Sequence, residues 1–314
     1  MAKPFGSWGD RSEFLSIRSR GLGGSDIAAI IGESHWGTPL SVFESKVYGK
    51  PDDNDNEEAK HWGTLLEPVV RDEWNRRNAP RYAQTTNMTY CHNDYDYLLA
   101  NSDGFVYPSQ DATLQDSEGV YEGKTCTQFK AGEWADGVPD YYLPQPHWYM
   151  EIHGLPYAEV ACLIGGQSYV QYRVEADPDF QADLVEAAIQ FWHKFVLTET
   201  PPPPSGKAVD AKVLKRLHQA VHGETMEADP ELASDIALLS RLKAEAKAFD
   251  VSELDQSVRA RIGSAECVTF NGRVIATYKE SKVSRLDAKA LVAAYPKATA
   301  KFRVESTQRK LLTK

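Results

Sequence analysis

Four consecutive prolines, residues 201–204, divide this chain of 314 residues into two parts. A proline run favours an extended conformation and cannot continue a helix. Ser205 and Gly206 follow the run, so residues 201–206 are predicted to form a linker. We therefore expect a first domain over residues 1–200 and an extension over residues 207–314.

The two parts differ in charge. Residues 1–204 contain 15 Lys and Arg against 31 Asp and Glu, whereas residues 205–314 contain 20 against 14. Net charge affects steering and non-specific binding rather than the fold. An acidic first part could bind a divalent metal, and a basic extension could bind phosphate. The alternative is that the charge difference reflects ordinary surface composition and marks no binding site. The extension is therefore expected either to contact nucleic acid or a partner, or to be a packing appendage.

The composition indicates a globular protein that does not span a membrane. Hydrophobic residues make up 42% of the chain, which is enough for a packed core. No apolar run is long enough for a membrane span, and the first residues lack the apolar segment of a signal peptide. We therefore expect a cytoplasmic location. The four cysteines contain no Cys-x-x-Cys pair, so reduced thiols are expected rather than a zinc ribbon.

Helical and strand patterns alternate along the first part. A chain with this order is expected to form an α/β domain with a central mixed sheet flanked by helices. Ser25 is predicted to be the N-cap of the first helix. The predicted helices are residues 25–31, 39–48, 64–77, 139–153 and 178–197, and the predicted strands are residues 97–107, 119–127, 157–164 and 168–174.

The second part is expected to be an α+β extension. Asn271 and Gly272 lie between two β-rich runs, which is a strong hairpin signal. The predicted elements are helices over residues 208–222, 230–249 and 287–295, a hairpin over residues 266–280, and a strand over residues 300–307.

Three residues of the first part carry the chemistry of a metal-dependent hydrolase. Asp103 follows the apolar run that contains Leu98 and Leu99, and Glu122 and Lys124 lie two apart in a predicted strand. Residues two apart in a strand share a face. Two carboxylates and a carbonyl bind a hard divalent ion, and a neighbouring lysine stabilises developing negative charge. This spacing alone is weak evidence, because a surface Glu–Lys pair is the commoner reading.

The order of the surrounding motifs is more specific. The sequence resembles the YqaJ-like viral recombinase family, whose relatives include phage lambda exonuclease, over nearly all of residues 13–200. The resemblance implies a PD-(D/E)xK restriction-endonuclease-like core. The motifs that carry it are Arg18, GLGGSDIAAI at residues 21–30, HWGTLLEP at residues 61–68, the Asp103…Glu122-Gly123-Lys124 set and YYLPQPHWY at residues 141–149.

The resemblance also implies a role for individual residues. Asp103, Glu122 and the Gly123 carbonyl would bind metal, with Glu67 as a direct or water-mediated ligand. Lys124 would be the catalytic lysine, and Gln145 would help to place the attacking water. Arg18 and Ser25 would bind the 5′-terminal phosphate. Arg20 is an alternative to Arg18 in this role. The sequence departs from many relatives at His147, where they have glutamine.

The activity implied is that of a 5′→3′ exonuclease of linear double-stranded DNA that uses one or two Mg²⁺ ions, with Mn²⁺ as a substitute. The implied biology is phage or prophage recombination, with a ring of three subunits and a separate single-strand annealing protein. Two alternatives remain: an endonuclease of the same fold, and a DNA-binding or assembly module without catalytic activity. The related iron–sulfur nucleases need a cysteine cluster near the end of the domain, so no such centre is expected.

Overall fold

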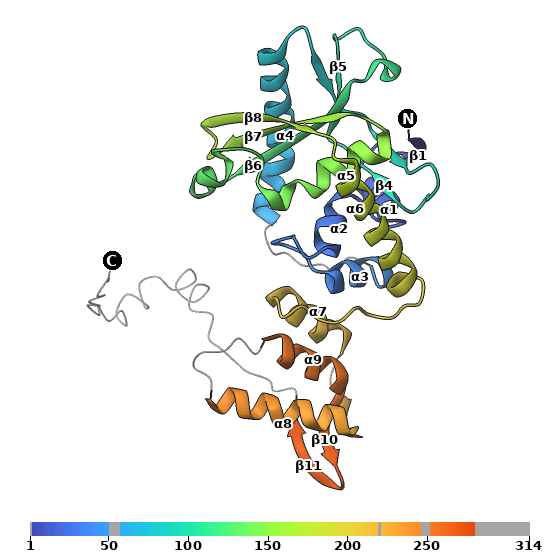
Figure 1. Ribbon diagram of the computed structural model, residues 1–314, viewed down its shortest axis with the longest axis vertical. Helices are drawn as coiled ribbons and strands as arrows, with labels where there is room; N and C mark the ends of the chain where they lie inside the picture. Colours follow the sequence, from blue (N-terminus) through green and yellow to red (C-terminus); the bar gives the residue numbers. More distant parts are fainter. Residues whose placement is uncertain (1, 50–56, 219–220, 246–251, 280–314) are drawn as a thin grey trace, which may run out of the picture.

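The first part of the chain is built on a mixed sheet of five strands in the order β2-β5-β6-β7-β8 (Figure 1). β6 and β7 are parallel, and the other neighbours are antiparallel. The computed structural model describes residues 2–49, 57–218, 221–245 and 252–279. The predicted α/β class with a central mixed sheet is confirmed. The strands are β2 (Tyr82–Gln84), β5 (Gly104–Tyr107), β6 (Gly119–Cys126), β7 (Tyr157–Ile164) and β8 (Ser168–Glu175).

Helices cover both faces of this sheet. α4 (Glu57–Asn78) packs on the face that carries Tyr121, and α5 (Pro144–His153) packs on the face that carries Val120. Adjacent residues of a strand point to opposite faces, which explains why β6 contributes to both core layers. α5 also lies within the crossover that joins β6 to β7, because parallel strands need a long connection. α6 (Pro178–Phe191) packs against α5.

A smaller antiparallel sheet and three helices lie beside this core. β1 (Lys3–Ser7) pairs with β3 (Met88–Cys91), which pairs with β4 (Leu99–Ala100). α2 (Gly24–Ile30) and α3 (Pro39–Val47) confirm two predicted helices. β1 and α1 (Arg11–Arg18) were not predicted from the sequence pattern, because both are short and partly exposed.

Two predicted elements of the first part have different limits in the structure. The strand predicted over residues 97–107 is interrupted between β4 and β5, so Asp103 lies in an irregular segment. The helix predicted from residue 139 begins at Pro144, after a short 3₁₀ turn at Asp140–Tyr142.

The part that follows the prolines contains α7 (Ala208–Leu217), α8 (Pro230–Glu245), α9 (Ser252–Ile262) and a three-stranded sheet. The predicted helix over residues 208–222 is wrong at its end, because β9 (Val221–Glu227) pairs in parallel with β10 (Ala265–Phe270). The predicted hairpin is confirmed. Asn271 and Gly272 both have positive φ, at 51° and 71°, and connect β10 to β11 (Arg273–Thr277). The predicted elements over residues 287–295 and 300–307 lie outside the described residues.

α7 packs on the first part of the chain although it follows the prolines. Its Val213 and Leu214 belong to the same core cluster as the α3 residue Phe43. Arg216 forms two hydrogen bonds, of 2.6 and 2.7 Å, with the carboxylate of Glu44 in α3. Residues 201–206 therefore lead into a helix anchored on the first body, and the domain division at these residues stays a prediction.

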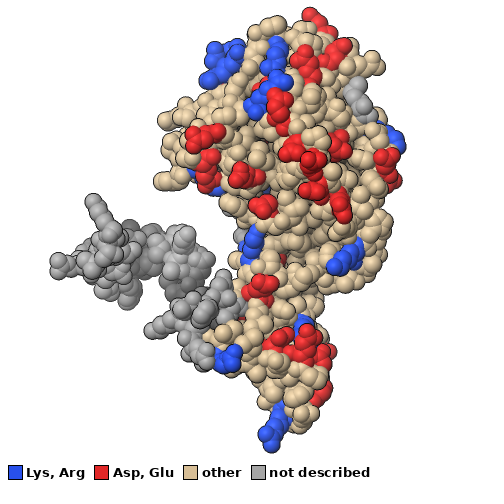
Figure 2. Space-filling view, viewed as in Figure 1, with Lys and Arg blue, Asp and Glu red and all other residues tan. Residues whose placement is uncertain are grey.

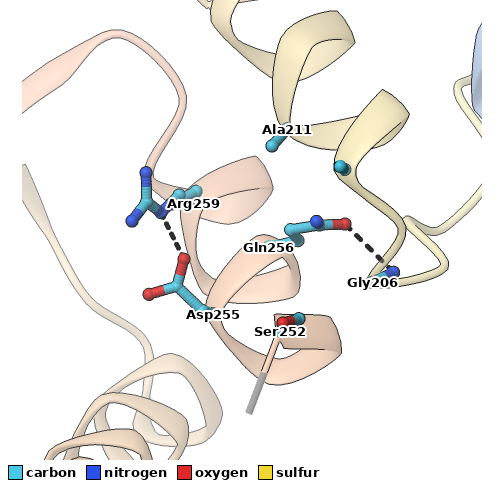
Figure 3. Close-up of a pocket in the computed structure, with 7 residues that line it drawn as sticks. Gly206, Ala211, Ser252, Asp255, Gln256 and Arg259 are labelled. Carbon is cyan, nitrogen blue, oxygen red and sulfur yellow. Dashed lines mark hydrogen bonds and ion pairs between the residues drawn. The ribbon is translucent and has the colours of Figure 1, made fainter. Parts of the chain in front are cut away.

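The start of α7 and α9 enclose a shallow hollow (Figure 3). Gln256 accepts a hydrogen bond of 3.0 Å from the Gly206 amide and donates one of 3.0 Å to the Lys207 carbonyl. Arg259 pairs with Asp255 at 2.5 Å. The Gln256 hydrogen bonds hold α9 to the start of α7, whereas the Arg259–Asp255 pair lies within α9. The hollow is thus a packing feature between these two helices. Within the described part of the chain, no helix has the length and apolar character that a membrane span requires.

Candidate active site

Two carboxyl groups meet where β5 pairs with β6. Asp103 directly precedes β5, whose first residue Gly104 is paired with Tyr121 of β6. The Oδ2 atom of Asp103 accepts a hydrogen bond of 2.9 Å from the backbone amide of Gly123. Glu122 is 1% exposed. The structure thus brings Asp103, Glu122 and the Gly123 backbone together.

Lys124 lies on the same face of β6 as Glu122 and is bonded to it. Its ammonium group donates to a carboxylate oxygen of Glu122 and, at 2.9 Å, to Oε1 of Gln145 at the start of α5. The Nε2 atom of Gln145 donates in turn to the hydroxyl of Tyr149 at 3.1 Å. Gln145 and Tyr149 share a face because they are four residues apart on one helix. This chain of contacts holds the lysine beside the carboxylates.

Glu67 approaches the same centre from α4. α4 runs close to β6, since a Cβ atom on Gly63 would lie 3.9 Å from Oγ1 of Thr125. Burial raises the pKa of Glu67 to about 7, with a further contribution from the negative charge of Asp103. The structure therefore places Glu67 within electrostatic reach of Asp103, on a different element from the other acidic residues.

The carboxyl groups of the site are destabilised in their ionised form. Burial, followed by the charge of Asp103, raises the pKa of Glu122 to about 8, even though Lys124 opposes the shift. Burial also raises the pKa of Asp103. For Lys124, burial lowers the pKa, but Glu122 and Asp103 outweigh it and the net shift is upward. Lys124 therefore stays positively charged, and the acidic groups of the site outnumber it. A further positive charge would stabilise the ionised form of these carboxyl groups.

These residues fit a hard divalent cation. The Oε2 atom of Glu122 is buried and has no hydrogen-bond partner, which leaves an oxygen free to bind an ion. In the described parts of the chain, no three His, Cys, Asp or Glu side chains close around an ion as they stand. The groups that could bind an ion are the two carboxylates, Asp103 and Glu122, with the Gly123 carbonyl, and Glu67 lies within electrostatic reach of Asp103. Such oxygen donors, completed by water, suit Mg²⁺ or Mn²⁺.

The predicted phosphate-binding residues form a second group beside α2. An Nη atom of Arg18 donates a hydrogen bond to the Ser25 hydroxyl. Gly24 is required here because a Cβ atom would lie 2.7 Å from the Tyr149 ring. The hydroxyl of the same Tyr149 accepts the hydrogen bond from Gln145. Tyr149 thus connects this group to the lysine and carboxylates. Arg20, the alternative to Arg18, instead packs over the ring of Phe5 at 4.7 Å.

The sequence assignment of Ser25 as the N-cap is wrong. Gly23 occupies the N-cap position of α2, and its amide donates to Asp26 Oδ2 at 2.9 Å. The helix is capped by its own Asp26 carboxylate, which also pairs with Lys46 at 2.9 Å. Burial alone would raise the pKa of Asp26, but Lys46 and Arg18 lower it. The Asp26 charge is therefore neutralised within the protein, and the Ser25 hydroxyl bonds to Arg18 instead of capping the helix.

Several contributors were not identified from the sequence. Lys46 supports Asp26 across 20 positions of sequence, and Arg71 of α4 acts electrostatically on both Glu67 and Asp103. No local motif marks either residue. His147 is buried against Phe180, with ring centroids 5.1 Å apart.

Residues 13–156 match the YqaJ-like viral recombinase domain. A protein of Bacillus subtilis (strain 168), described as uncharacterized protein YqaJ, is 27% identical over 307 residues, covering 94% of this chain and 92% of its own length.

Two solved structures also resemble the chain. An alkaline exonuclease of Laribacter hongkongensis is 16% identical, with a TM-score of 0.46, and covers 60% of this chain and 94% of its own. A phage-related exonuclease of Haemophilus somnus 129PT is 12% identical, with a TM-score of 0.41, and covers 57% of this chain and 96% of its own.

Proposed function

We propose that this protein, whose residues 13–156 match the YqaJ-like viral recombinase domain, is a metal-dependent 5′→3′ exonuclease of linear double-stranded DNA. The observation that carries the proposal is the buried Glu122, whose Oε2 atom lacks a partner, beside Asp103 and Lys124. A silent module of the same fold has no need to maintain this destabilised arrangement of ionisable groups.

The proposed reaction is hydrolysis of a phosphodiester. Asp103, Glu122 and the Gly123 carbonyl would hold one Mg²⁺, or Mn²⁺ in its place, and Glu67 would contribute through water or to a second ion. When bound, the ion supplies a water of lowered pKa and neutralises phosphate charge. Lys124 donates hydrogen bonds to the attacking water or to the phosphate oxygens, where negative charge develops in the transition state. Gln145, fixed between Lys124 and Tyr149, orients the same groups.

Arg18 and Ser25 give the reaction its proposed direction. A guanidinium beside a hydroxyl binds a terminal phosphate through charge-assisted hydrogen bonds. Attack of water on phosphorus, with cleavage of the P–O3′ bond, releases a 5′-mononucleotide and leaves a 5′-phosphate on the next residue. Each step thus regenerates the group that Arg18 and Ser25 recognise, which would support repeated cutting along one strand.

A linear duplex labelled at either 5′ end or 3′ end tests this proposal in Mg²⁺. We expect label to be lost from the 5′ end first, faster when that end carries a phosphate, and no loss with the Lys124→Ala variant. A covalently closed circle is the matched substrate, because an exonuclease leaves it intact. Cutting of the circle would instead identify an endonuclease, and intact substrates in both Mg²⁺ and Mn²⁺ would identify a silent module.

The proposal extends to assembly and biology. The remaining 3′ strand would pass to a separate single-strand annealing protein in the cytoplasm of a bacterium that carries the phage or prophage. A ring of three copies would let basic residues face DNA while the outer surface stays acidic, as on the face in Figure 2. α4 exposes Trp62, Leu65 and Val69, an apolar face available for such assembly. The mass in solution, measured by light scattering, tests for the trimer.

A further inference from the structure

An exposed tryptophan lies in the loop between α2 and α3. Trp36 is 54% exposed, although tryptophan is usually a core residue. It belongs to a cluster of rings, here called the ring platform, that consists of His35, Trp36, Tyr141 and Tyr142. The Trp36 and Tyr142 rings are tilted by 34° with centroids 5.5 Å apart, and His35 stacks on Tyr141 at 4.2 Å.

The ring platform is held in place from below. Tyr142 contacts Trp134, which is fully buried, with centroids 5.6 Å apart. The Tyr141 hydroxyl donates to Glu133 and receives a hydrogen bond of 3.2 Å from Lys130. Because these rings are already ordered, a flat ligand would bind Trp36 at little cost in conformational entropy.

The ring platform is adjacent to the candidate active site. The Lys124 ammonium lies 5.4 Å from the centroid of the Tyr142 ring. A second ammonium, that of Lys130, lies 5.7 Å from the Trp36 centroid and 4.9 Å from that of Tyr141. Aromatic rings combined with cations are the arrangement by which proteins stack the bases of single-stranded nucleic acid.

The surroundings favour a base over a phosphate backbone. The hollow beside the ring platform is lined by four acidic residues, which repel phosphate; they are Glu33, Glu133, Asp136 and Asp140. A neutral nucleobase can approach Trp36 while its own phosphate stays on the side of Lys124. Resting on the proposed nuclease function, we propose that the ring platform stacks an unpaired nucleobase of the strand whose phosphodiester lies at Lys124. The platform would hold the terminal nucleotide apart from its complement.

Fluorescence of 2-aminopurine tests this inference without cleavage. The probe is a 5′-phosphorylated duplex with two unpaired nucleotides at its 5′ end, one of them 2-aminopurine, bound in EDTA to prevent hydrolysis. We expect the wild-type protein to quench the fluorescence by stacking. Trp36→Ala should abolish the quenching and weaken binding of this probe about ten-fold, in line with the loss of one stacked base. Trp36→Phe should retain most of both effects.

Tyr48→Ala is the matched control, because Tyr48 is an equally exposed aromatic residue at the end of α3. It should behave as the wild type. Unaltered quenching in Trp36→Ala, or no quenching by the wild type, would overturn the inference. Thermal melting of Trp36→Ala checks that it is folded. The nuclease proposal fails separately, if the wild type does not cleave duplex DNA in Mg²⁺ or Mn²⁺, so the two failures are distinguishable.

Discussion

The Asp103 carboxylate accepts a hydrogen bond of 2.9 Å from the backbone amide of Gly123. This bond ties the irregular segment before β5 to the middle of β6. It holds Asp103 next to Glu122. The pairing of backbone and side chain therefore preorganises the site before any ion or substrate binds.

The first prediction concerns the stability of the metal-free protein. Glu67 and Glu122 have pKa values raised from 4.5 to about 7 and about 8. Between the ordinary pKa of 4.5 and the raised values, the folded state binds more protons than the unfolded state. The free energy of unfolding therefore falls as pH rises through this range. We expect the melting temperature in EDTA to be highest near pH 5 and to decrease up to pH 9. Glu122→Gln should raise the melting temperature at pH 8 and flatten this profile.

Mg²⁺ provides the control for that prediction. A bound cation stabilises the ionised carboxylates, so its effect on the melting temperature should be larger at pH 8 than at pH 5. Glu122→Gln should remove most of the Mg²⁺ effect. If the melting temperature of the wild type in EDTA is constant from pH 5 to pH 9, the raised pKa values of Glu67 and Glu122 are contradicted.

The second prediction separates catalysis from metal binding. Lys124→Ala removes the only ammonium bonded to both Glu122 and Gln145 among the described residues. We expect the cleavage rate to fall by roughly 10²-fold or more, because a transition-state donor is lost. Mg²⁺ should still raise the melting temperature of this variant. Tyr149→Phe, which loses only the contact with Gln145, should have a much smaller effect on the rate.

The third prediction concerns the end of the DNA. Arg18→Ala removes the guanidinium that donates to Ser25. The preference for a 5′-phosphorylated end over a 5′-hydroxyl end should fall by about ten-fold to a hundred-fold, because a charge-assisted contact of ~1.5–3 kcal/mol is lost. Arg20→Ala is the matched control, since Arg20 packs over Phe5. If Arg20→Ala loses the preference and Arg18→Ala keeps it, the assignment must be exchanged.

The sequence predicted the features of the site and of the fold that depend on short spacing. Glu122 and Lys124 share a face because they alternate along one strand, and Asn271-Gly272 forms its hairpin because both residues accept positive φ. It could not place Lys46 beside Asp26, or Tyr142 beside Lys124, because these contacts depend on how helices and loops pack. It also extended the helix of residues 208–222 into the first two residues of β9, because the pairing of β9 with distant β10 overrides local propensity.

The last prediction concerns the attachment of the part after the prolines. Asp210 of α7 is fully buried, and its carboxylate accepts hydrogen bonds from the Thr38 hydroxyl and from the Ser205 amide and hydroxyl. Asp210→Ala leaves these donors unpaired, so we expect a loss of roughly 2–4 kcal/mol in the free energy of unfolding.

Urea unfolding followed by circular dichroism measures that loss. Asp111→Ala is the matched control, because Asp111 is exposed in a loop of the first body and should change stability by less than about 0.5 kcal/mol. Thr38 is also the N-cap of α3, so its loss of a partner should loosen the end of the loop that carries Trp36. If Asp210→Ala unfolds at the wild-type urea concentration, α7 is not an energetic part of the first body, and its burial against α3 contributes little to stability.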